Sequence, residues 1–185
     1  MQLNLPTILT LLRIVLIPFF IVAFYLPTAW GREAAAALFV LAAFTDWLDG
    51  YLARKWNQTS PFGAFLDPVA DKLMVAAALL LLVSDMPELM VVIPAIVIIG
   101  REIAISALRE WMAEMGERAH VAVSMIGKIK TTAQMAAIFL LIYHEPVGIF
   151  PTPVVGMVLL YVAMILTLWS MFIYLKAAWP VLKRG

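Results

Sequence analysis

Residues 46–71 read DWLDGYLARKWNQTSPFGAFLDPVAD, and the chain is organised around this stretch. It places four aspartates inside two otherwise apolar segments that a short polar turn connects. These are Asp46, Asp49, Asp67 and Asp71. An aspartate near the centre of a bilayer costs about 2.5–3.5 kcal/mol on insertion scales. If the flanking segments cross a membrane, four aspartates therefore require a strong compensating interaction.

Helical spacing predicts that the four carboxylates converge in one pocket. The first segment carries a stripe at positions i, i+3, i+4 and i+7, which consists of Asp46, Asp49, Gly50 and Ala53. The second carries a stripe at i, i+4 and i+8, which consists of Gly63, Asp67 and Asp71. When the two helices fold back about the turn, the register pairs Asp46 with Asp71, Gly50 with Asp67, and Arg54 with Gly63.

A pocket of four carboxylates favours a metal site. Mg²⁺ prefers oxygen ligands, and two ions about 3.5–4 Å apart are a common device for phosphoryl chemistry. Asp46 and Asp49 approach the C-terminal end of their helix, where the helix dipole disfavours negative charge. A structural interpretation pairs the acids with nearby basic residues instead, namely Arg54, Lys55 and Lys72. Three cations do not balance four clustered acids, so we favour the metal.

The composition indicates an integral membrane protein. Of the 185 residues, 64% are hydrophobic and 14% are charged, whereas ordinary soluble domains carry about 25% charged residues. This length suits one domain, which we expect to span residues 1–185. The sequence has no cysteine, so disulfides and thiolate metal sites are excluded. The net charge of +1 says nothing about partners, but no nucleic-acid face is visible in the sequence, so no nucleic-acid partner is expected.

Six apolar segments of about 20 residues, the length that a bilayer requires, predict an all-α fold with six transmembrane helices. A short N-terminal interfacial segment precedes them, and Pro6 suits the first turn of a helix. Thr7 and Thr10 are expected to bond back to main-chain carbonyls. Ser60 is the expected N-cap of the third helix, with Pro61 as its first residue. The predicted spans are residues 7–27, 33–55, 61–84, 87–113, 121–144 and 151–176.

The basic residues predict the orientation of the helices. With the N-terminus inside, twelve of the thirteen lysines and arginines fall on the inner side, and only Arg32 falls outside. Cytoplasmic loops of membrane proteins carry this excess of positive charge. The aspartate pocket is therefore expected to open toward the cytoplasm.

A second polar cluster is predicted between the fourth and fifth spans. Arg101 lies near the middle of the fourth span, Arg109 follows two turns later, and Lys128 begins the fifth. A deep arginine needs a partner or a wet cavity. Because arginine binds phosphate through two hydrogen bonds and lysine adds a point charge, these three residues favour an anion pocket. The alternative is an ion-pair network of Arg101, Glu102 and Arg109 that only holds helices together.

The aspartate stretch resembles, without departure, the signature of the CDP-alcohol phosphatidyltransferase family. The eight fixed positions follow the pattern D-x2-D-G-x2-A-R-x8-G-x3-D-x3-D. The resemblance implies a six-helix membrane fold and transfer of a phosphatidyl group from CDP-diacylglycerol to an alcohol, with release of CMP. Residues 105–111 (ISALREW) and 127–134 (GKIKTTAQ) resemble the bacterial branch whose acceptor is sn-glycerol 3-phosphate.

The family pattern also implies roles for single residues. Asp46, Asp49 and Asp67 are expected to bind one divalent ion, Mg²⁺ or Mn²⁺, and Asp46, Asp67 and Asp71 a second. Asp71 is also expected to be the general base. The residues expected to contact CDP-diacylglycerol are Thr7, Gly50, Ala53, Arg54, Ser60 and Gly63. The residues expected to bind glycerol phosphate are Arg101, Arg109 and Lys128. A homodimer in the bacterial plasma membrane is expected as well.

Three alternatives stay open at this point. Tight helix packing would also explain Gly50, Ala53 and Gly63. Another member of the family would use a different alcohol, but an acceptor without phosphate leaves the predicted anion pocket with little to bind. A divalent-cation transporter would place its carboxylates near the midplane on broken helices, whereas these acids cluster toward the inner end of unbroken segments.

Overall fold

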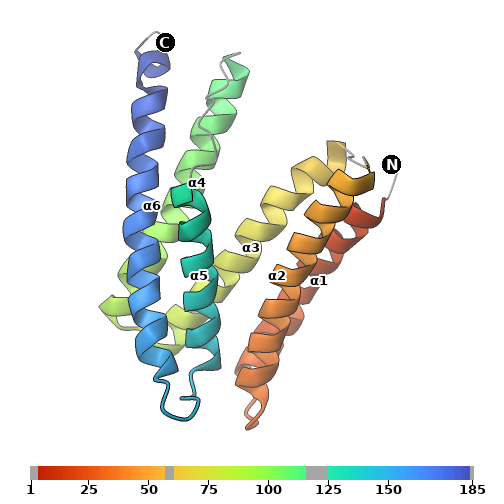
Figure 1. Ribbon diagram of the computed structural model, residues 1–185, viewed down its shortest axis with the longest axis vertical. Helices are drawn as coiled ribbons and strands as arrows, with labels where there is room; N and C mark the ends of the chain where they lie inside the picture. The colour runs from red at the N-terminus through yellow and green to blue at the C-terminus, as the bar shows by residue number, and fades with distance from the viewer. Residues whose placement is uncertain (1–3, 57–60, 116–124, 184–185) are drawn as a thin grey trace.

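The computed structural model describes residues 4–56, 61–115 and 125–183, which form six α-helices (Figure 1). Their bounds are α1 (Leu5–Tyr25), α2 (Gly31–Trp56), α3 (Pro61–Asp85), α4 (Leu89–Glu114), α5 (Met125–Tyr143) and α6 (Thr152–Leu182). Each helix overlaps one predicted segment. The predicted start of the fifth, residues 121–124, lies outside the described residues.

Several helix ends differ from the predicted bounds by one or two residues, and the end of α6 differs by more. The first helix starts at Leu5, so Pro6 lies within its first turn and the predicted interfacial segment shortens. The sixth helix continues to Leu182, beyond the predicted end at residue 176. The additional residues begin with Ala177 and Ala178, and alanine is a good helix former although it adds little hydrophobic length.

Within the described residues, four helices are long and apolar enough to cross a membrane. They are α1, residues 31–53 of α2, α4, and residues 152–179 of α6. The protein is therefore an all-α membrane protein with several membrane-spanning helices. Helix α3 differs because Asp67, Asp71 and Lys72 interrupt its apolar sequence.

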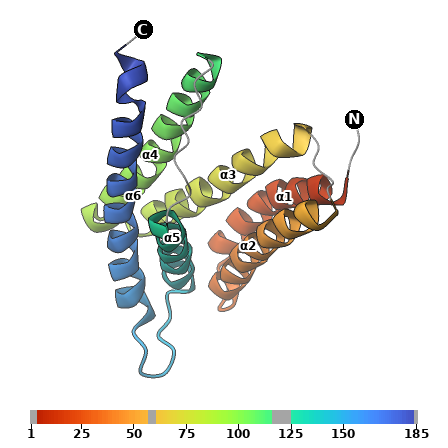
Figure 2. The same ribbon diagram turned by 45° about the horizontal axis from the view of Figure 1, so that its top comes forward.

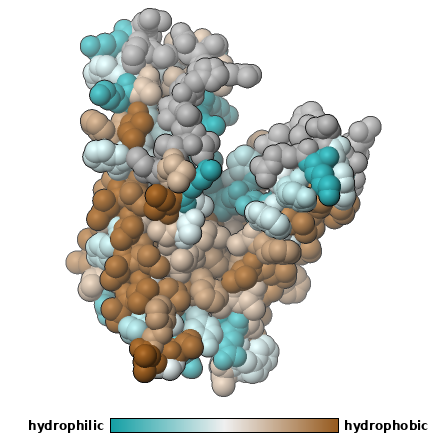
Figure 3. All heavy atoms as spheres, in the orientation of Figure 1, coloured by the Kyte–Doolittle hydropathy of each residue, from teal (hydrophilic) through white to brown (hydrophobic). Residues whose placement is uncertain are grey.

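The helices form two arms that diverge toward one end (Figures 1 and 2). Helices α1 and α2 pack together in one arm, α4 and α6 lie in the other, and α3 runs diagonally between them. Both chain termini lie at the open end. The space-filling view is hollowed between the arms, and hydrophilic residues lie near the base of this hollow (Figure 3).

The closed end is held by a tightly packed apolar core. Fully buried side chains from all six helices meet there, including Phe20, Phe39, Leu79, Ile98, Ile138 and Leu160. Small buried residues such as Ala35, Ala36 and Ala78 let the helix backbones approach closely. This packing fixes the angle between the arms and so determines the shape of the open end.

Arg32, the basic residue that the sequence places on the outer side, forms polar contacts at the closed end of the molecule. Its guanidinium forms an ion pair with Asp85 and lies 4.1 Å from the centre of the Phe24 ring. Beside this pair, the Tyr25 hydroxyl and Ser84 Oγ are 2.8 Å apart. These contacts join the end of α3 to the ends of α1 and α2.

Candidate active site

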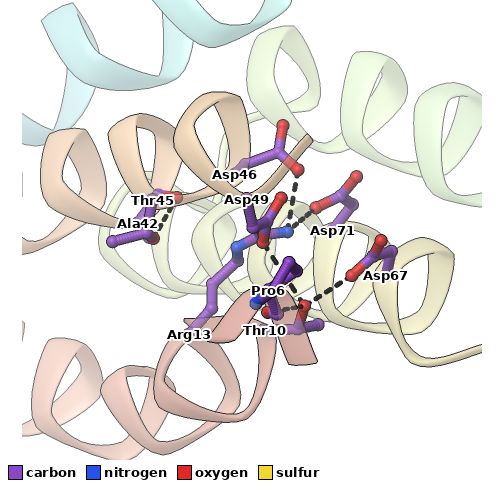
Figure 4. Close-up of polar contacts among 9 residues, drawn as sticks. All are labelled: Pro6, Thr10, Arg13, Ala42, Thr45, Asp46, Asp49, Asp67 and Asp71. Carbon is purple, nitrogen blue, oxygen red and sulfur yellow. Dashed lines mark hydrogen bonds and ion pairs between the residues drawn. The ribbon is translucent and has the colours of Figure 1, made fainter. Parts of the chain in front are cut away.

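Four acidic side chains converge between α2 and α3 toward the open end of the molecule (Figure 4). Asp46 and Asp49 come from α2, and Asp67 and Asp71 come from α3. Two polar residues of α1, Thr10 and Arg13, reach into the same group. We refer to these four carboxylates as the acid cluster.

Arg13 is the cation at the centre of the acid cluster. It is only 1% exposed, and its Nη2 lies 2.5 Å from Asp49 Oδ2. Its Nη1 lies 3.0 Å from Asp46 Oδ1 and also pairs with Asp71. Because one nitrogen contacts both Asp46 and Asp71, these carboxylates lie level with each other, as the predicted register of the hairpin requires.

Thr10 joins the remaining carboxylate to the cluster. Its Oγ1 lies 2.5 Å from Asp67 Oδ1 and 3.3 Å from Asp49 Oδ2. It also lies 3.1 Å from the carbonyl oxygen of Pro6, the main-chain contact that the sequence predicts. One hydroxyl carries one proton and can donate to only one of these acceptors at a time. Thr10 therefore leaves most of the hydrogen-bonding capacity of the carboxylates unused.

The acid cluster has the donor set and charge that suit divalent ions. Four carboxylates against one guanidinium leave three excess negative charges, and all the donor atoms of the carboxylates are oxygens, the ligands that Mg²⁺ prefers. The side chains of Asp46 and Asp71 are 47% and 48% exposed. In the described part of the chain, however, no three acidic or histidine side chains are arranged to hold one ion. Arg13 instead pairs with three of the four carboxylates.

The exposed side of the acid cluster borders a cavity of about 210 Å³ between α2, α3 and α5. Asp46 and Asp71 form its polar edge, and most of its wall is apolar, with contributions from Ala42, Met74 and Met135. We call it the apolar cavity. It connects the carboxylates with a surface that suits hydrocarbon groups.

A second cavity, of about 230 Å³, lies on the other side of Asp71. Three cations contribute to its wall, namely Lys72, Arg101 and Lys130. Both Arg101 Nη1 and Lys130 Nζ lie 2.9 Å from Glu102 Oε1. Three cations face two carboxylates, Glu102 and Asp71, so this cavity, which we call the basic cavity, has one spare positive charge for an anion.

Neighbouring residues orient the cations of the basic cavity. Arg101 Nη2 donates to Ser170 Oγ at 3.0 Å, and its guanidinium lies 5.7 Å from the centre of the Tyr174 ring. Lys72 donates to Ser106, whose hydroxyl in turn donates to the Glu102 carbonyl oxygen. The ion-pair alternative from the sequence is thus present in part, but with Lys130 in the place of Arg109.

The predicted acceptor residues divide between two environments. Arg101 borders the basic cavity, whereas Arg109 and Lys128 are exposed and do not border it. Sequence reasoning missed Lys72 and Lys130. A signal for Lys130 was present, because it falls on the helical face of α5 that also carries Ala133, Ala137 and Leu141, all buried. Lys128 lies off this face.

Sequence reasoning also missed Arg13, which it counted only as one of the inner cations. Pro6, Thr10 and Arg13 fall at i, i+4 and i+7, a partly polar stripe in an otherwise apolar helix. All three are buried. A polar stripe of this kind in a membrane helix indicates that the stripe faces other polar groups. The alternative to a metal site in the sequence analysis paired Lys72 with the aspartates, but in the structure Lys72 donates a hydrogen bond to Ser106.

The residues predicted to contact CDP-diacylglycerol are only partly described. Thr7 is buried in the first turn of α1, and Gly63 is buried near the start of α3. Gly50 and Ala53 of α2 are partly exposed. Ser60 and the side chain of Arg54 lie outside the described residues. Thr7 and Gly63 belong to the same end of the helices as the acid cluster.

Comparison with known proteins agrees with the geometry. Residues 3–169 match the family model described as CDP-alcohol phosphatidyltransferase. The chain is 58% identical over 179 residues to the CDP-diacylglycerol–glycerol-3-phosphate 3-phosphatidyltransferase of Yersinia enterocolitica (serotype O:8 / biotype 1B), with 97% of each chain covered. It is similar to proteins of the same name from Shigella flexneri (serotype 5b) and Pectobacterium atrosepticum, at 56% and 58% identity with 96% coverage.

Proposed function

Because the chain belongs to the CDP-alcohol phosphatidyltransferase family, we propose that it transfers the phosphatidyl group of CDP-diacylglycerol to sn-glycerol 3-phosphate. The products are phosphatidylglycerophosphate and CMP. The proposal depends on one observation above all: Asp71 borders both the apolar cavity and the basic cavity. The acid cluster thus adjoins both a surface suited to a lipid and a pocket suited to a phosphorylated alcohol. The family match favours this function over a cation transporter.

Divalent metal fits the acid cluster by charge and donor chemistry. Asp46, Asp49 and Asp67 would hold one Mg²⁺ or Mn²⁺ ion and Asp46, Asp67 and Asp71 a second, and the bound ions would polarise the diphosphate and offset its charge. Arg13 and Thr10 position the carboxylates from the side of α1.

Asp71 is the residue that we assign as general base. Its carboxylate is half exposed and stands at the border of the two cavities. It takes the proton from the primary hydroxyl of the acceptor, and the resulting oxygen attacks the phosphorus that carries diacylglycerol. The bond from that phosphorus to the bridging oxygen breaks, and CMP leaves with the bridging oxygen.

The two substrates are held by different helices. We assign CDP-diacylglycerol to Thr7, Gly50, Ala53, Arg54, Ser60 and Gly63, beside the apolar cavity that would receive its glycerol backbone. The acceptor phosphate is assigned to the basic cavity, where Lys72, Arg101 and Lys130 supply charge. Arg109 and Lys128 are proposed as further acceptor contacts from the exposed ends of α4 and α5. Holding both substrates in one orientation lowers the entropic part of the barrier.

Membrane placement follows from the same proposal. Residues 1–185 form one domain in which all six helices cross the bacterial plasma membrane, with residues 46–71 as its catalytic hairpin. The open end then faces the cytoplasm, which supplies sn-glycerol 3-phosphate and receives CMP. Two copies of the chain are proposed to form a homodimer.

The experiment that tests the function is CMP release by the detergent-purified protein with CDP-diacylglycerol, Mg²⁺ or Mn²⁺, and a panel of alcohols. We expect release with sn-glycerol 3-phosphate, and little with serine, inositol or unphosphorylated glycerol. Equal rates with phosphorylated and unphosphorylated alcohols would contradict the role of the basic cavity. CMP release that is independent of any alcohol would contradict transfer altogether.

A further inference from the structure

Gln134 is a buried polar residue whose side-chain carbonyl group has no hydrogen-bond partner among the described residues. It lies on α5 and is only 5% exposed, and its Oε1 accepts no hydrogen bond within the described part of the chain. A buried polar group without a partner costs about 1–3 kcal/mol. Such groups are rare in folded proteins, so this one calls for a functional explanation.

The position of Gln134 indicates what it would bind. Its side chain borders both the apolar cavity and the basic cavity, as do Asp71, Val75 and Thr131. Lys130 precedes it by one helical turn on the same face of α5. Gln134 therefore borders the same space as the carboxylate assigned as general base and the cations assigned to the acceptor phosphate.

We propose that Gln134 binds the secondary hydroxyl of the acceptor and so selects a three-carbon phosphate that carries a hydroxyl on its middle carbon. This inference depends on the proposed function. In sn-glycerol 3-phosphate the primary hydroxyl and the phosphate stand at opposite ends, and the secondary hydroxyl lies between them. A carboxamide both donates and accepts hydrogen bonds, as a hydroxyl does.

The selectivity that this contact provides has a definite size. An acceptor without the secondary hydroxyl leaves the carboxamide buried and unpaired in the complex, and sites of this kind discriminate strongly against such analogues. From the usual cost of an unpaired buried group, the wild type is expected to prefer the natural acceptor about ten- to a hundredfold in kcat/KM. The matched analogue is 3-hydroxypropyl phosphate, which keeps both ends of the molecule.

The test compares kcat/KM for these two acceptors in the wild type and in Gln134→Met, whose unbranched side chain has similar length without a polar amide. We expect the variant to lose activity with sn-glycerol 3-phosphate alone, so that the ratio falls toward one. The KM for CDP-diacylglycerol stays within about twofold, because no donor contact is removed. Thr131→Val is the matched control: Thr131 borders the same two cavities, but its hydroxyl already donates to the Gly127 carbonyl oxygen at 3.0 Å. It is expected to keep the wild-type ratio.

Three outcomes would overturn the inference. A wild-type ratio in Gln134→Met would overturn it alone, while leaving the proposed function in place. A wild type that releases no CMP with either acceptor would overturn the proposed function and the inference with it. If Gln134→Met does not fold, calorimetry on the wild type decides: tighter binding of sn-glycerol 3-phosphate than of 3-hydroxypropyl phosphate supports the inference, and equal affinities overturn it.

Discussion

Arg13 is the residue on which the arrangement of the acid cluster depends most. Its guanidinium is almost completely buried and pairs with Asp46, Asp49 and Asp71. Removing one partner from a buried ion pair typically costs about 3–5 kcal/mol, because it leaves an uncompensated charge. The four carboxylates would then repel one another unless another cation replaced the guanidinium.

Substitution of Arg13 should therefore couple the stability of the protein to divalent ions. We predict that Arg13→Met lowers the melting temperature of the detergent-solubilised protein by several degrees. We also predict that Mg²⁺ raises this temperature more in the variant than in the wild type, since the bound ion supplies the missing positive charge. Thermal unfolding with and without Mg²⁺ measures both effects.

Arg32→Met provides the control for this experiment. Arg32 pairs with Asp85 at the closed end, far along α3 from the acid cluster, so its loss should lower stability without changing the response to Mg²⁺. The same Mg²⁺ response in the wild type and in Arg13→Met would show that divalent ions do not bind among these carboxylates.

The two acidic residues of α3 in the acid cluster are predicted to be essential for activity. Asp67→Asn and Asp71→Asn keep the size of the side chain but remove its charge and its ability to take a proton. We predict that each lowers CMP release by about a thousandfold or more, since Asp71→Asn removes both the base and a charged ligand and Asp67→Asn removes a charged ligand. Asp85→Asn, which changes an acid at the opposite end of α3, should stay active.

Elution as a single species and an unchanged melting curve would show that the inactive variants are folded. Wild-type turnover in Asp71→Asn would remove its assignment as general base.

At the level of single residues, the sequence was most informative about the acids. Their spacing at three and four residues on two apolar segments predicts convergence without knowledge of any other helix. It did not predict that Arg13 would occupy the centre of the cluster, because that depends on how α1 packs against α2 and α3. Helix periodicity identifies the polar face of α1 but does not show which helix that face contacts.

Helix α5 shows how the rotation of one helix selects the residues of a site. Lys130 is 8% exposed and Gln134 is 5% exposed, whereas Lys128, two residues before Lys130, points away from the cavities and is exposed. Two residues correspond to a rotation of about 200° around the helix axis. The buried face was visible in the sequence, since Ala133, Ala137 and Leu141 share it with Lys130. The prediction nevertheless selected Lys128, which lies nearer to the helix start.

The rotation of α5 leads to a prediction about acceptor binding. We expect Lys130→Met and Arg101→Ala each to raise the KM for sn-glycerol 3-phosphate about tenfold or more, the usual cost of a hydrogen bond to a charged group. The KM for CDP-diacylglycerol should change by less than about twofold. Lys128→Met, on the exposed face of the same helix, should have a smaller effect than Lys130→Met. Initial rates with each substrate varied in turn separate the two constants.

Equal effects of Arg101→Ala on both KM values would indicate that this arginine only holds α4 against α6, where it contacts Ser170. A larger effect of Lys128→Met than of Lys130→Met would place the acceptor on the outer face of α5.

At the scale of the whole molecule, the length and apolarity of the segments predicted the number and order of the helices. The two diverging arms were not predictable, because they depend on close contacts between small residues such as Ala35 and Ala78. The two cavities were not predictable for the same reason. They exist where the arms diverge and where α5 faces Asp71.

The membrane topology of the six helices can be tested with single cysteines. If all six helices cross the membrane, Glu88 and Met115 lie on opposite sides, with Glu88 outside and Met115 in the cytoplasm. If α3 does not cross, the two positions exchange sides. Because the sequence has no cysteine, Glu88→Cys and Met115→Cys can each be labelled without background. Both residues are exposed at the ends of α4.

We predict that a membrane-impermeant maleimide added to intact cells labels Glu88→Cys and not Met115→Cys, and that permeabilised cells show labelling of both. The reverse pattern in intact cells would contradict the six-span topology with a cytoplasmic N-terminus.

A radiochemical experiment tests directly whether the protein transfers the phosphatidyl group in a metal-dependent reaction. It measures the transfer of label from sn-[¹⁴C]glycerol 3-phosphate into chloroform-soluble lipid by the purified protein and CDP-diacylglycerol, before and after excess chelator. We predict that labelled lipid and CMP form in equal amounts, that the chelator stops both, and that Mg²⁺ or Mn²⁺ restores both. Undiminished lipid formation in the presence of the chelator, or CMP release without labelled lipid, would contradict a metal-dependent transfer at the acid cluster.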